Sequence, residues 1–512
     1  MMWQNLRLRA RRLIESLYRR FNVPGGALGL IAGYFIVQWL VRIIIGGGLE
    51  LDEAEQVIFA QRLQAGYSPD PPLYTWLQIP LFALFGEGVP ALSLLKNLLL
   101  FTTCASSYFS ARHCGLSPEH AGLAALSLIL LPQIGWESQR DLTHSVLVTT
   151  MASLTLWAVL CLLRGAQGVG QYLLLGLLAG LGMLSKFNYG LLVLVVVIAL
   201  GSLRPGLLFR PAMLAALLVG LAIVSPYLVW AADHLATATA TSYKLKTGGE
   251  DYWGGVLQGL GSLAKAYLAF SGLFLVAFMA VFMPWRTAWP VVTSANREAH
   301  PIGLRFLKRL FLITPVVMVA YLLVSGGTVY RDRWLLPLLF FLPLLCFASV
   351  PEHWLDERRK TLFKKVLVVV MLILPAGLLA RNYLYPLYGT VVKPHFPGVG
   401  LARELVARAG EFSIVIAESS FIGGNLKPYL GARLVDTPTV DFPIKAIVEG
   451  TDKPVLLIWN GGDYPDGPPD ELVTHIRRAG LTVAPVGEPA TLEKRYRFSD
   501  DQSFVLAWQF WK

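Results

Sequence analysis

The chain has 512 residues, of which 55% are hydrophobic and only 15% charged, whereas an average soluble domain carries roughly 25% charged residues. These charges are too few to cover several soluble domains, and the mean hydropathy of +0.55 points the same way. The net charge of +11 does not indicate a nucleic-acid partner, because the basic residues collect in short stretches between long apolar runs.

The N-terminal residues 1–26 are polar and basic, and no small-residue cleavage site follows the apolar run after them. A cleavable signal peptide would need such a site. Lysine and arginine are enriched on the cytoplasmic side of membrane proteins. We therefore expect a cytoplasmic N-terminus that leads into an uncleaved first span.

Apolar runs long enough to cross a bilayer core of roughly 30 Å recur from Ala27 to Leu379. They predict a polytopic α-helical transmembrane domain over residues 27–381, in the cytoplasmic (inner) membrane. About eleven spans are expected, at 27–49, 90–110, 118–134, 142–163, 171–185, 188–203, 212–231, 264–284, 309–325, 334–349 and 363–381. An odd number places the C-terminus outside the cytoplasm.

Four carboxylates, Glu50, Asp52, Glu53 and Glu55, open the first outer segment, residues 50–89. Ionisable groups beside hydrocarbon usually line a polar cavity or pathway. Paired carboxylates also suit general-base chemistry, because the charge of one raises the proton affinity of its neighbour. The alternative is that they only cap an interfacial helix, where acidic N-terminal residues are favourable.

A Pro-Pro-Leu-Tyr-Thr-Trp element follows at residues 71–76. The proline pair ends any preceding helix. Tyr74 and Trp76 are amphipathic aromatics of the kind that collect at membrane interfaces. An interfacial turn with anchoring aromatics would explain this element equally well.

Together, the Asp52-Glu53 pair and the Pro-Pro-Leu-Tyr-x-Trp element resemble the membrane glycosyltransferases of the C-type fold (GT-C). Within that superfamily, the similarity is to the protein O-mannosyltransferases and the lipid A aminoarabinose transferases. The resemblance covers about residues 27–380 and is firm over 50–78. It implies an enzyme that transfers a sugar from a polyprenyl-phosphate donor to a lipid, glycan or protein hydroxyl on the outer face of the membrane.

The resemblance also implies roles for individual residues. Asp52 matches the base or orienting group that faces the acceptor, and Glu53 its partner, whereas Glu50 has no corresponding role. Residues expected to line the donor and acceptor sites are Glu55, Asp70, Tyr74, Trp76 and His234. Pro69-Asp70 replaces the Glu-Lys that precedes the proline pair in the aminoarabinose transferase, so no phosphate or metal contact carries over from there.

Asp141 lies where the fourth span is expected to begin, and the resemblance places an acidic site residue there. Alternatively, it caps the helix that follows. His144 is three residues further on and would share a helical face with it. A divalent-metal site built from Asp141, His144 and His234 is conceivable, but no spacing compels it, and no other cofactor is indicated.

Three outer-side cations are candidate ligands of the donor phosphate. Lys186 sits in a tight turn between two apolar spans and would either meet the phosphate or snorkel to lipid headgroups. Arg333 and Arg331 belong to an Arg-Asp-Arg-Trp-Leu-Leu-Pro run that resembles an element of the family, and arginine suits bidentate phosphate binding. Their alternative role is an ion pair with Asp332.

From about Asn382 the composition becomes that of a soluble domain. Strand-like runs at 412–419, 453–460 and 502–511 and a helix-like run at 470–480 predict a small extracytoplasmic α/β domain over 382–512. No nucleophile elbow, phosphate-binding loop or metal spacing occurs in it.

The leading hypothesis is therefore an inverting transferase for lipid-linked sugars, with membrane lipids and an acceptor as partners. The competing hypothesis is a transporter or flippase of a polar lipid or lipid-linked sugar, which would predict broken helices in two similar halves. The ionisable groups cluster instead at outer span ends, and the halves do not look alike. A non-catalytic membrane scaffold is the third possibility.

Overall fold

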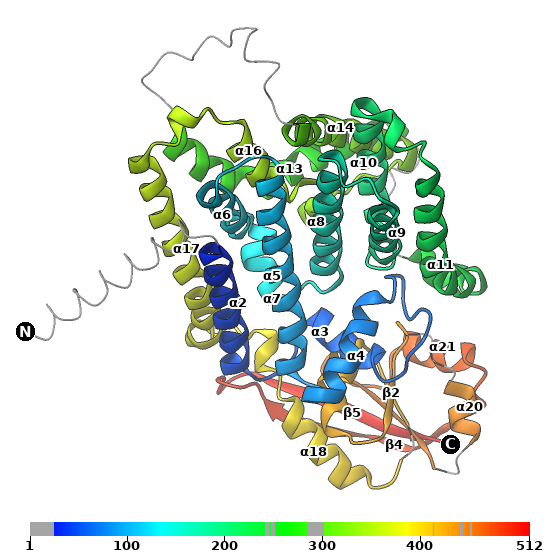
Figure 1. Cartoon of the computed structure of the whole chain (residues 1–512). Helices are drawn as coiled ribbons and strands as arrows, with labels where there is room; N and C mark the ends of the chain where they lie inside the picture. The colour runs from blue at the N-terminus through cyan, green and yellow to red at the C-terminus, as the bar shows by residue number, and fades with distance from the viewer. Residues whose placement is uncertain are drawn as a thin grey trace, which may run out of the picture. The chain divides into compact units, whose positions relative to one another are not determined.

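Apolar helices make up most of the chain between Gly26 and Leu384 in the computed structural model (Figure 1). The structure describes residues 25–240, 246, 251–283, 302–412, 414–440, 442, 444–450 and 453–512, so the basic stretch 1–24 lies outside the described part. Within the described part, seven helices are long and apolar enough to cross a membrane. They are α2 (Gly26–Ile45), α5 (Val89–His113), α8 (His144–Leu163), α11 (Pro211–Asp233), α13 (Tyr252–Phe282), α14 (Ile302–Ser325) and α17 (Glu357–Leu384).

The remaining expected spans are less regular. The segment expected at 334–349 is a pair of helical stretches, Asp332–Leu339 and Leu342–Ser349, bent by 49°. Three further expected spans coincide with the apolar helices Pro118–Leu130, Val169–Met183 and Tyr189–Leu203, which are shorter than the roughly 20 residues that a straight span needs. The polytopic helical fold is confirmed, but only seven of the eleven expected spans are full-length, unbroken helices.

The chain forms two compact units, and the first consists of residues 1–37, 96–139 and 144–374. Among its long helices α8 is the most buried, and each of the others presents one buried face; on α13, the side chains of Phe274, Phe278 and Phe282 recur every four residues and are buried. Besides the long helices it contains α6 (Pro118–Leu126), a π-helical turn (Gln133–Glu137), α7 (Ser138–Arg140), α9 (Val169–Met183), α10 (Tyr189–Leu203), α12 (Leu235–Thr239), α15 (Leu336–Leu339) and α16 (Leu342–Ser349).

The second unit consists of residues 38–95, 140–143 and 375–512. It contains a five-stranded sheet of order β2-β1-β3-β5-β4, in which β1 pairs in parallel with β2 and β3, and β5 is antiparallel to β3 and β4. The strands are β1 (Ile414–Ala417), β2 (Leu434–Asp436), β3 (Val455–Asn460), β4 (Pro485–Arg495) and β5 (Ser503–Trp511). The helices are α3 (Leu51–Phe59), α4 (Leu73–Phe85), α18 (Gly398–Ala409), α19 (Ser420–Leu426), α20 (Ile444–Glu449) and α21 (Asp470–Arg478).

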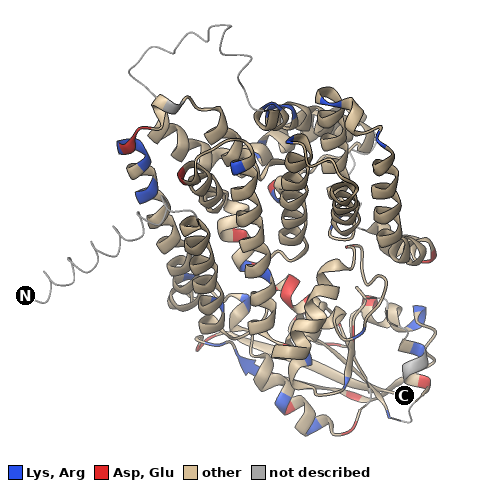
Figure 2. Ribbon diagram, in the orientation of Figure 1, with Lys and Arg blue, Asp and Glu red and all other residues tan. Residues whose placement is uncertain are grey.

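These elements confirm the predicted α/β fold of the C-terminal region. The strand-like runs correspond to β1, β3 and β5, and the helix-like run corresponds to α21. The sequence did not reveal β2, which is only three residues long, or β4, whose pattern is polar and half exposed. Figure 2 shows that charged residues are sparse along the long helices and more frequent in this sheet and its helices.

The segment expected as the first outer loop is part of the sheet-containing unit and is partly helical. Ile58 and Phe59 of α3 are fully buried in the same apolar core as the strands β1 and β3. A Cβ atom at Gly424 of α19 would lie 2.1 Å from the backbone oxygen of Ala54, so only glycine permits this approach. The acidic helix α3 is therefore packed on α19 of the C-terminal region.

Candidate active site

The acidic motif forms the N-terminal turn of α3. Glu50 is the N-cap residue, and its backbone N–H donates to Oε2 of Glu53 at 3.1 Å. Carboxylates in a first helical turn interact favourably with the positive end of the helix dipole. The local sequence thus explains why the helix begins here and why Asp52 and Glu53 both lie at its exposed N–H groups.

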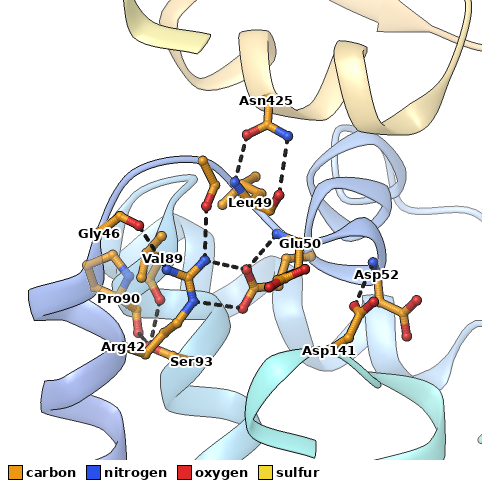
Figure 3. A network of polar contacts seen from close by, with 12 residues as sticks. Arg42, Gly46, Leu49, Glu50, Asp52, Val89, Pro90, Ser93, Asp141 and Asn425 are labelled. Carbon is orange, nitrogen blue, oxygen red and sulfur yellow. Dashed lines mark hydrogen bonds and ion pairs between the residues drawn. The ribbon is translucent and has the colours of Figure 1, made fainter. Parts of the chain in front are cut away.

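A buried arginine of the first span, Arg42, holds Glu53. Figure 3 labels Arg42 and draws its polar contacts as dashed lines. Nη2 of Arg42 lies 2.6 Å from Oε2 of Glu53, and Nε lies 3.3 Å from Oε1. The same guanidinium donates to the backbone oxygens of Gly46 and Gly48, at 3.1 and 3.2 Å. One arginine therefore joins the end of α2, the glycine turn and the start of α3.

Two further contacts hold the segment just before the motif. Glu50 pairs with Arg381 near the end of α17, at 3.0 Å. The side chain of Asn425 accepts from the backbone N–H of Leu49 at 2.7 Å and donates to its oxygen at 3.5 Å (Figure 3). Glu50 and Glu53 are therefore buried in defined ion pairs, whereas Asp52 and Glu55 are half-buried.

Asp52 points toward a different segment from Glu53. Oδ1 of Asp141 accepts the backbone N–H of Asp52 at 3.0 Å (Figure 3). Oδ2 of Asp52 accepts the backbone N–H of Thr143 at 3.1 Å. Leu142, between the two bonding partners, has a φ of +66°, which is uncommon and strained for a residue with a side chain. Oδ1 of Asp52 makes no hydrogen bond to any described residue. One carboxylate oxygen is thus fixed by the chain, whereas the other has no hydrogen-bond partner in the part of the chain that the structure describes.

The structure brings Asp141 next to Asp52 but differs from the sequence expectation for Asp141 and His144. The helix α8 begins at His144, and the left-handed backbone of Leu142 interrupts any helical relation between Asp141 and His144. The expected shared face of these two residues is therefore not formed. Asp141 does act as a cap, but for α3, which lies 89 residues earlier in the chain.

The expected lining residues of the second unit lie on α3, on α4 and between them. Glu55 and Asp70 are half-buried, and Trp76 donates to the backbone oxygen of Gln64 at 2.8 Å. Tyr74 is fully buried, and this burial, with the negative charges of Glu53 and Asp52, raises the pKa of its hydroxyl. Tyr74 therefore stays protonated beside the motif.

The expected donor-phosphate ligands Lys186, Arg331 and Arg333 all lie in the first unit. Lys186 donates to Oγ of Ser145 at 2.8 Å, and Asn188 of the same turn donates to the backbone oxygen of Trp334 at 3.0 Å. The turn between α9 and α10 is therefore tied to the segment that carries Arg333. Lys186 and Arg333 come from segments that this unit holds together.

The carboxylate of Asp332 does not bind the guanidinium groups of the neighbouring arginines in the described part of the chain. Its Oδ2 accepts from Gln133 at 2.6 Å, and its Oδ1 accepts the backbone N–H of Arg333 at 2.9 Å. Neither guanidinium, of Arg331 or of Arg333, has a hydrogen-bond or ion-pair partner among the described residues. The alternative of an Asp332 ion pair is therefore absent from this part of the chain.

The residues suggested for a metal site do not form one in the described part of the chain. No group of three or more His, Cys, Asp and Glu side chains there is placed to hold a metal ion. His234 instead stacks on Trp230, with ring centroids 4.8 Å apart, and its Nδ1 lies 2.8 Å from the Trp230 backbone oxygen.

A cavity of about 360 Å³ lies beside the segment that leads into α3. Its lining includes Gly48, Leu49, Phe396, Tyr429 and Arg497. Ligand pockets for small molecules usually begin at about 300 Å³. The second unit therefore offers room for a sugar-sized group next to the acidic helix.

Sequence reasoning missed Arg42 and Arg381. Each is a single arginine at the end of a long apolar run, and charged residues inside such runs usually have a partner or a function. That signal was present in the sequence and would have indicated them, although not their partners Glu53 and Glu50.

Comparison with known proteins identifies the family. Residues 69–230 match the family model described as dolichyl-phosphate-mannose-protein mannosyltransferase. The lipopolysaccharide core galacturonosyltransferases RgtA and RgtB of Rhizobium johnstonii are 33% and 32% identical to this chain, each over 94% of it and 96% of their own length. The chain belongs to the GT-C-type membrane glycosyltransferases.

The fold agrees with this assignment. The crystal structure of ArnT from Cupriavidus metallidurans bound to undecaprenyl phosphate superimposes with a TM-score of 0.56, at 13% identity, covering 95% of this chain and 98% of that one. Its apo form gives 0.54. The protein is thus a glycosyltransferase of the GT-C type, and the alternative of a flippase is not favoured.

The buried Arg42–Glu53 pair predicts a stability effect in this GT-C enzyme. Glu53→Gln leaves a buried guanidinium without its counter-charge, and removal of one partner of such a pair costs about 3–5 kcal/mol. We expect a clearly lower thermal unfolding midpoint in detergent, partly restored by adding Arg42→Gln. Glu449→Gln, in an exposed pair with Lys445, is the control and should change little. An unchanged midpoint for Glu53→Gln would contradict this role.

Proposed function

We propose that this enzyme transfers a sugar from a polyprenyl-phosphate donor to a hydroxyl group of a lipopolysaccharide core acceptor, with Asp52 as the general base. The observation that carries the proposal is the Asp52 carboxylate, with Oδ2 fixed by Thr143 and Oδ1 open to a ligand. The names of RgtA and RgtB support a lipopolysaccharide acceptor and a galacturonosyl group. The bound undecaprenyl phosphate in ArnT supports a lipid-phosphate donor.

In the proposed reaction, Oδ1 of Asp52 accepts the proton of the acceptor hydroxyl as its oxygen attacks the anomeric carbon. A carbon–oxygen bond forms on one face of the sugar, and the bond to the phosphate oxygen breaks on the other, which inverts the anomeric configuration. The leaving group is polyprenyl phosphate, whose charge cationic side chains stabilise. Asp141 fixes the backbone that carries Asp52 and acts as a positioning residue.

Glu53 contributes to the reaction by holding its neighbour Asp52 in position. Its carboxylate is committed to Arg42 and to the backbone of Glu50, so we assign it the task of holding α3 rather than proton transfer. The acceptor sugar is proposed to lie near α3, where the cavity beside Tyr429 offers space. No metal is required by this scheme.

Asp52→Asn tests the proposed base directly. The substitution keeps the size of the side chain and a hydrogen-bond acceptor for Thr143 but removes the basic oxygen. A general base typically contributes about 10²- to 10⁴-fold in rate, or roughly 3–5 kcal/mol of barrier. Sugar transfer by the purified variant should fall by that factor at an unchanged unfolding midpoint. Asp466→Asn, at an exposed position between β3 and α21, is the control and should transfer at the wild-type rate. Transfer at the wild-type rate by a stable Asp52→Asn protein would remove Asp52 as the base.

The donor phosphate is proposed to bind Arg333 and Arg331, with Lys186 beside them. Both guanidinium groups are unpaired among the described residues, and Asn188 ties the Lys186 turn to this segment. Loss of a charged hydrogen bond costs about 1.5–3 kcal/mol. Arg333→Ala and Arg331→Ala should therefore raise KM for the lipid-linked donor roughly 10- to 100-fold. Arg433→Ala, whose guanidinium lies over the Phe412 ring, is the control. An unchanged donor KM in both variants would show that these arginines do not bind the donor phosphate.

The enzyme is proposed to reside in the inner membrane with its N-terminus in the cytoplasm and its C-terminal domain outside. The basic N-terminus and the eleven apolar segments support this orientation. A reporter that is active only in the cytoplasm should stay inactive when fused after Lys512, while one active only outside should give a signal. Strong cytoplasmic activity at this position would overturn the orientation and the location of the site.

A further inference from the structure

An exposed apolar patch lies at the end of the last long helix, in the second unit. The end of α17 and the 3-10 turn Tyr385–Tyr388 expose Tyr383, Leu384, Tyr385, Leu387 and Tyr388, the last two to 77% and 83%. Soluble proteins rarely leave such residues together in contact with water. These five residues, with Phe498, are called the interfacial patch below.

Phe498 joins this patch from the turn between β4 and β5, more than a hundred residues later. Its ring centroid lies 5.4 Å from that of Tyr383 and 5.5 Å from that of His395. The guanidinium of Arg497 lies 4.5 Å from the Phe498 ring centroid. The side chain of Gln502, at the other end of the turn, donates to the backbone oxygen of Gly389 at 2.9 Å. The turn is therefore fastened to the end of α17.

The backbone of Phe498 is strained. Its φ is +66°, a region that glycine adopts freely and that costs other residues roughly 1–2 kcal/mol. Even so, the ring remains 46% exposed, so burial of the aromatic group does not explain the strain. Strained residues that persist commonly mark a functional position.

The patch continues two helices that are apolar enough to cross a membrane. Residues 366–380 of α17 form an uninterrupted apolar run just before Tyr383. The Tyr383 hydroxyl donates to the backbone oxygen of Ile44 in the last turn of α2, at 3.3 Å, and Ile44 is itself exposed. Nη1 of Arg497 donates to the backbone oxygen of Ile45 at 2.9 Å. Tyrosine and other aromatic residues collect where such helices leave the hydrocarbon.

We propose that the interfacial patch, with Phe498 at its tip, inserts into the headgroup boundary of the membrane that α2 and α17 cross. The exposed Asp500 and Asp501 follow Phe498 in the same turn and favour water, so insertion stops at this boundary. The occupant of the patch is thus the lipid surface, and neither a second copy of the chain nor a soluble protein.

This contact has a consequence that rests on the proposed function. Arg497 holds the end of α2, directly before the glycine turn and the motif helix α3. Contact of the tip with the lipid surface would therefore fix the depth of Asp52 relative to the headgroups, where the phosphate of a lipid-linked donor lies.

A depth measurement tests the membrane contact without reference to activity. The full chain, with its four native cysteines replaced by alanine and a single spin-labelled cysteine at Phe498, is placed in nanodiscs of phosphatidylethanolamine and phosphatidylglycerol. We expect the label to collide more with oxygen, which partitions into lipid, than with a water-soluble nickel chelate. A label at Tyr464, an exposed position elsewhere in the same unit, should show the reverse. Preferential collision with nickel at position 498, or protection from both reagents, would overturn the proposal.

A second variant tests the consequence for the enzyme. Phe498→Gly removes the ring and relieves the strained backbone, so the fold should be retained. Transfer in nanodiscs should fall about 10- to 100-fold, because a small displacement of catalytic groups has effects of this size. Val486→Ser, at an exposed position of β4, is the control. Full transfer by Phe498→Gly would overturn the link to the site, whereas normal transfer by Asp52→Asn would overturn the proposed function alone.

Discussion

The buried pair of Arg42 and Glu53 is the interaction on which the arrangement of the acidic motif depends. A charged pair out of water is stable only when its remaining donors and acceptors are satisfied. Here the extra donors of Arg42 go to the backbone of Gly46 and Gly48, and Glu53 takes the N–H of Glu50. These hydrogen bonds fix the end of α2, the glycine turn and the start of α3 relative to one another. Asp52 lies in the first turn of α3, so its position depends on them.

The pair also separates the tasks of two adjacent carboxylates. Glu53 points to Arg42 and is inaccessible, whereas Asp52 lies on another side of the helix, partly exposed, and meets Thr143. Successive residues of a helix are about 100° apart, so neighbours in sequence do not share a face. The Asp-Glu pair is therefore better understood as one group for positioning and one group for chemistry.

The sequence predicted those features that depend on residues close together in the chain. Apolar runs predicted the helices, and short strand-like runs predicted β1, β3 and β5. The resemblance to the GT-C family, and not a local pattern, singled out Asp52 as a site residue. The sequence failed where long-range contacts decide the outcome. Nothing local indicates that Asn425 binds Leu49, that Asp141 caps α3, or that α4 is a helix inside the unit that carries the sheet. Hydropathy alone also did not distinguish the shorter apolar helices and the bent pair from full-length spans, because it reports composition and not the length or straightness of a helix.

The bond between Asn425 and Leu49 joins residues 376 positions apart, and this distance has a consequence during synthesis. At translation rates of about 5–20 residues per second, Asn425 follows Leu49 by on the order of 20 to 75 seconds. Arg42 and Glu53, only eleven residues apart, are made almost together. The nascent chain can thus form the ion pair long before Asn425 exists, and in that interval the motif helix is held by the ion pair and, once residues 141–143 are made, by their bonds to Asp52. The first contact of the acidic site can therefore form early in synthesis, whereas its contact with Asn425 can form only near the end.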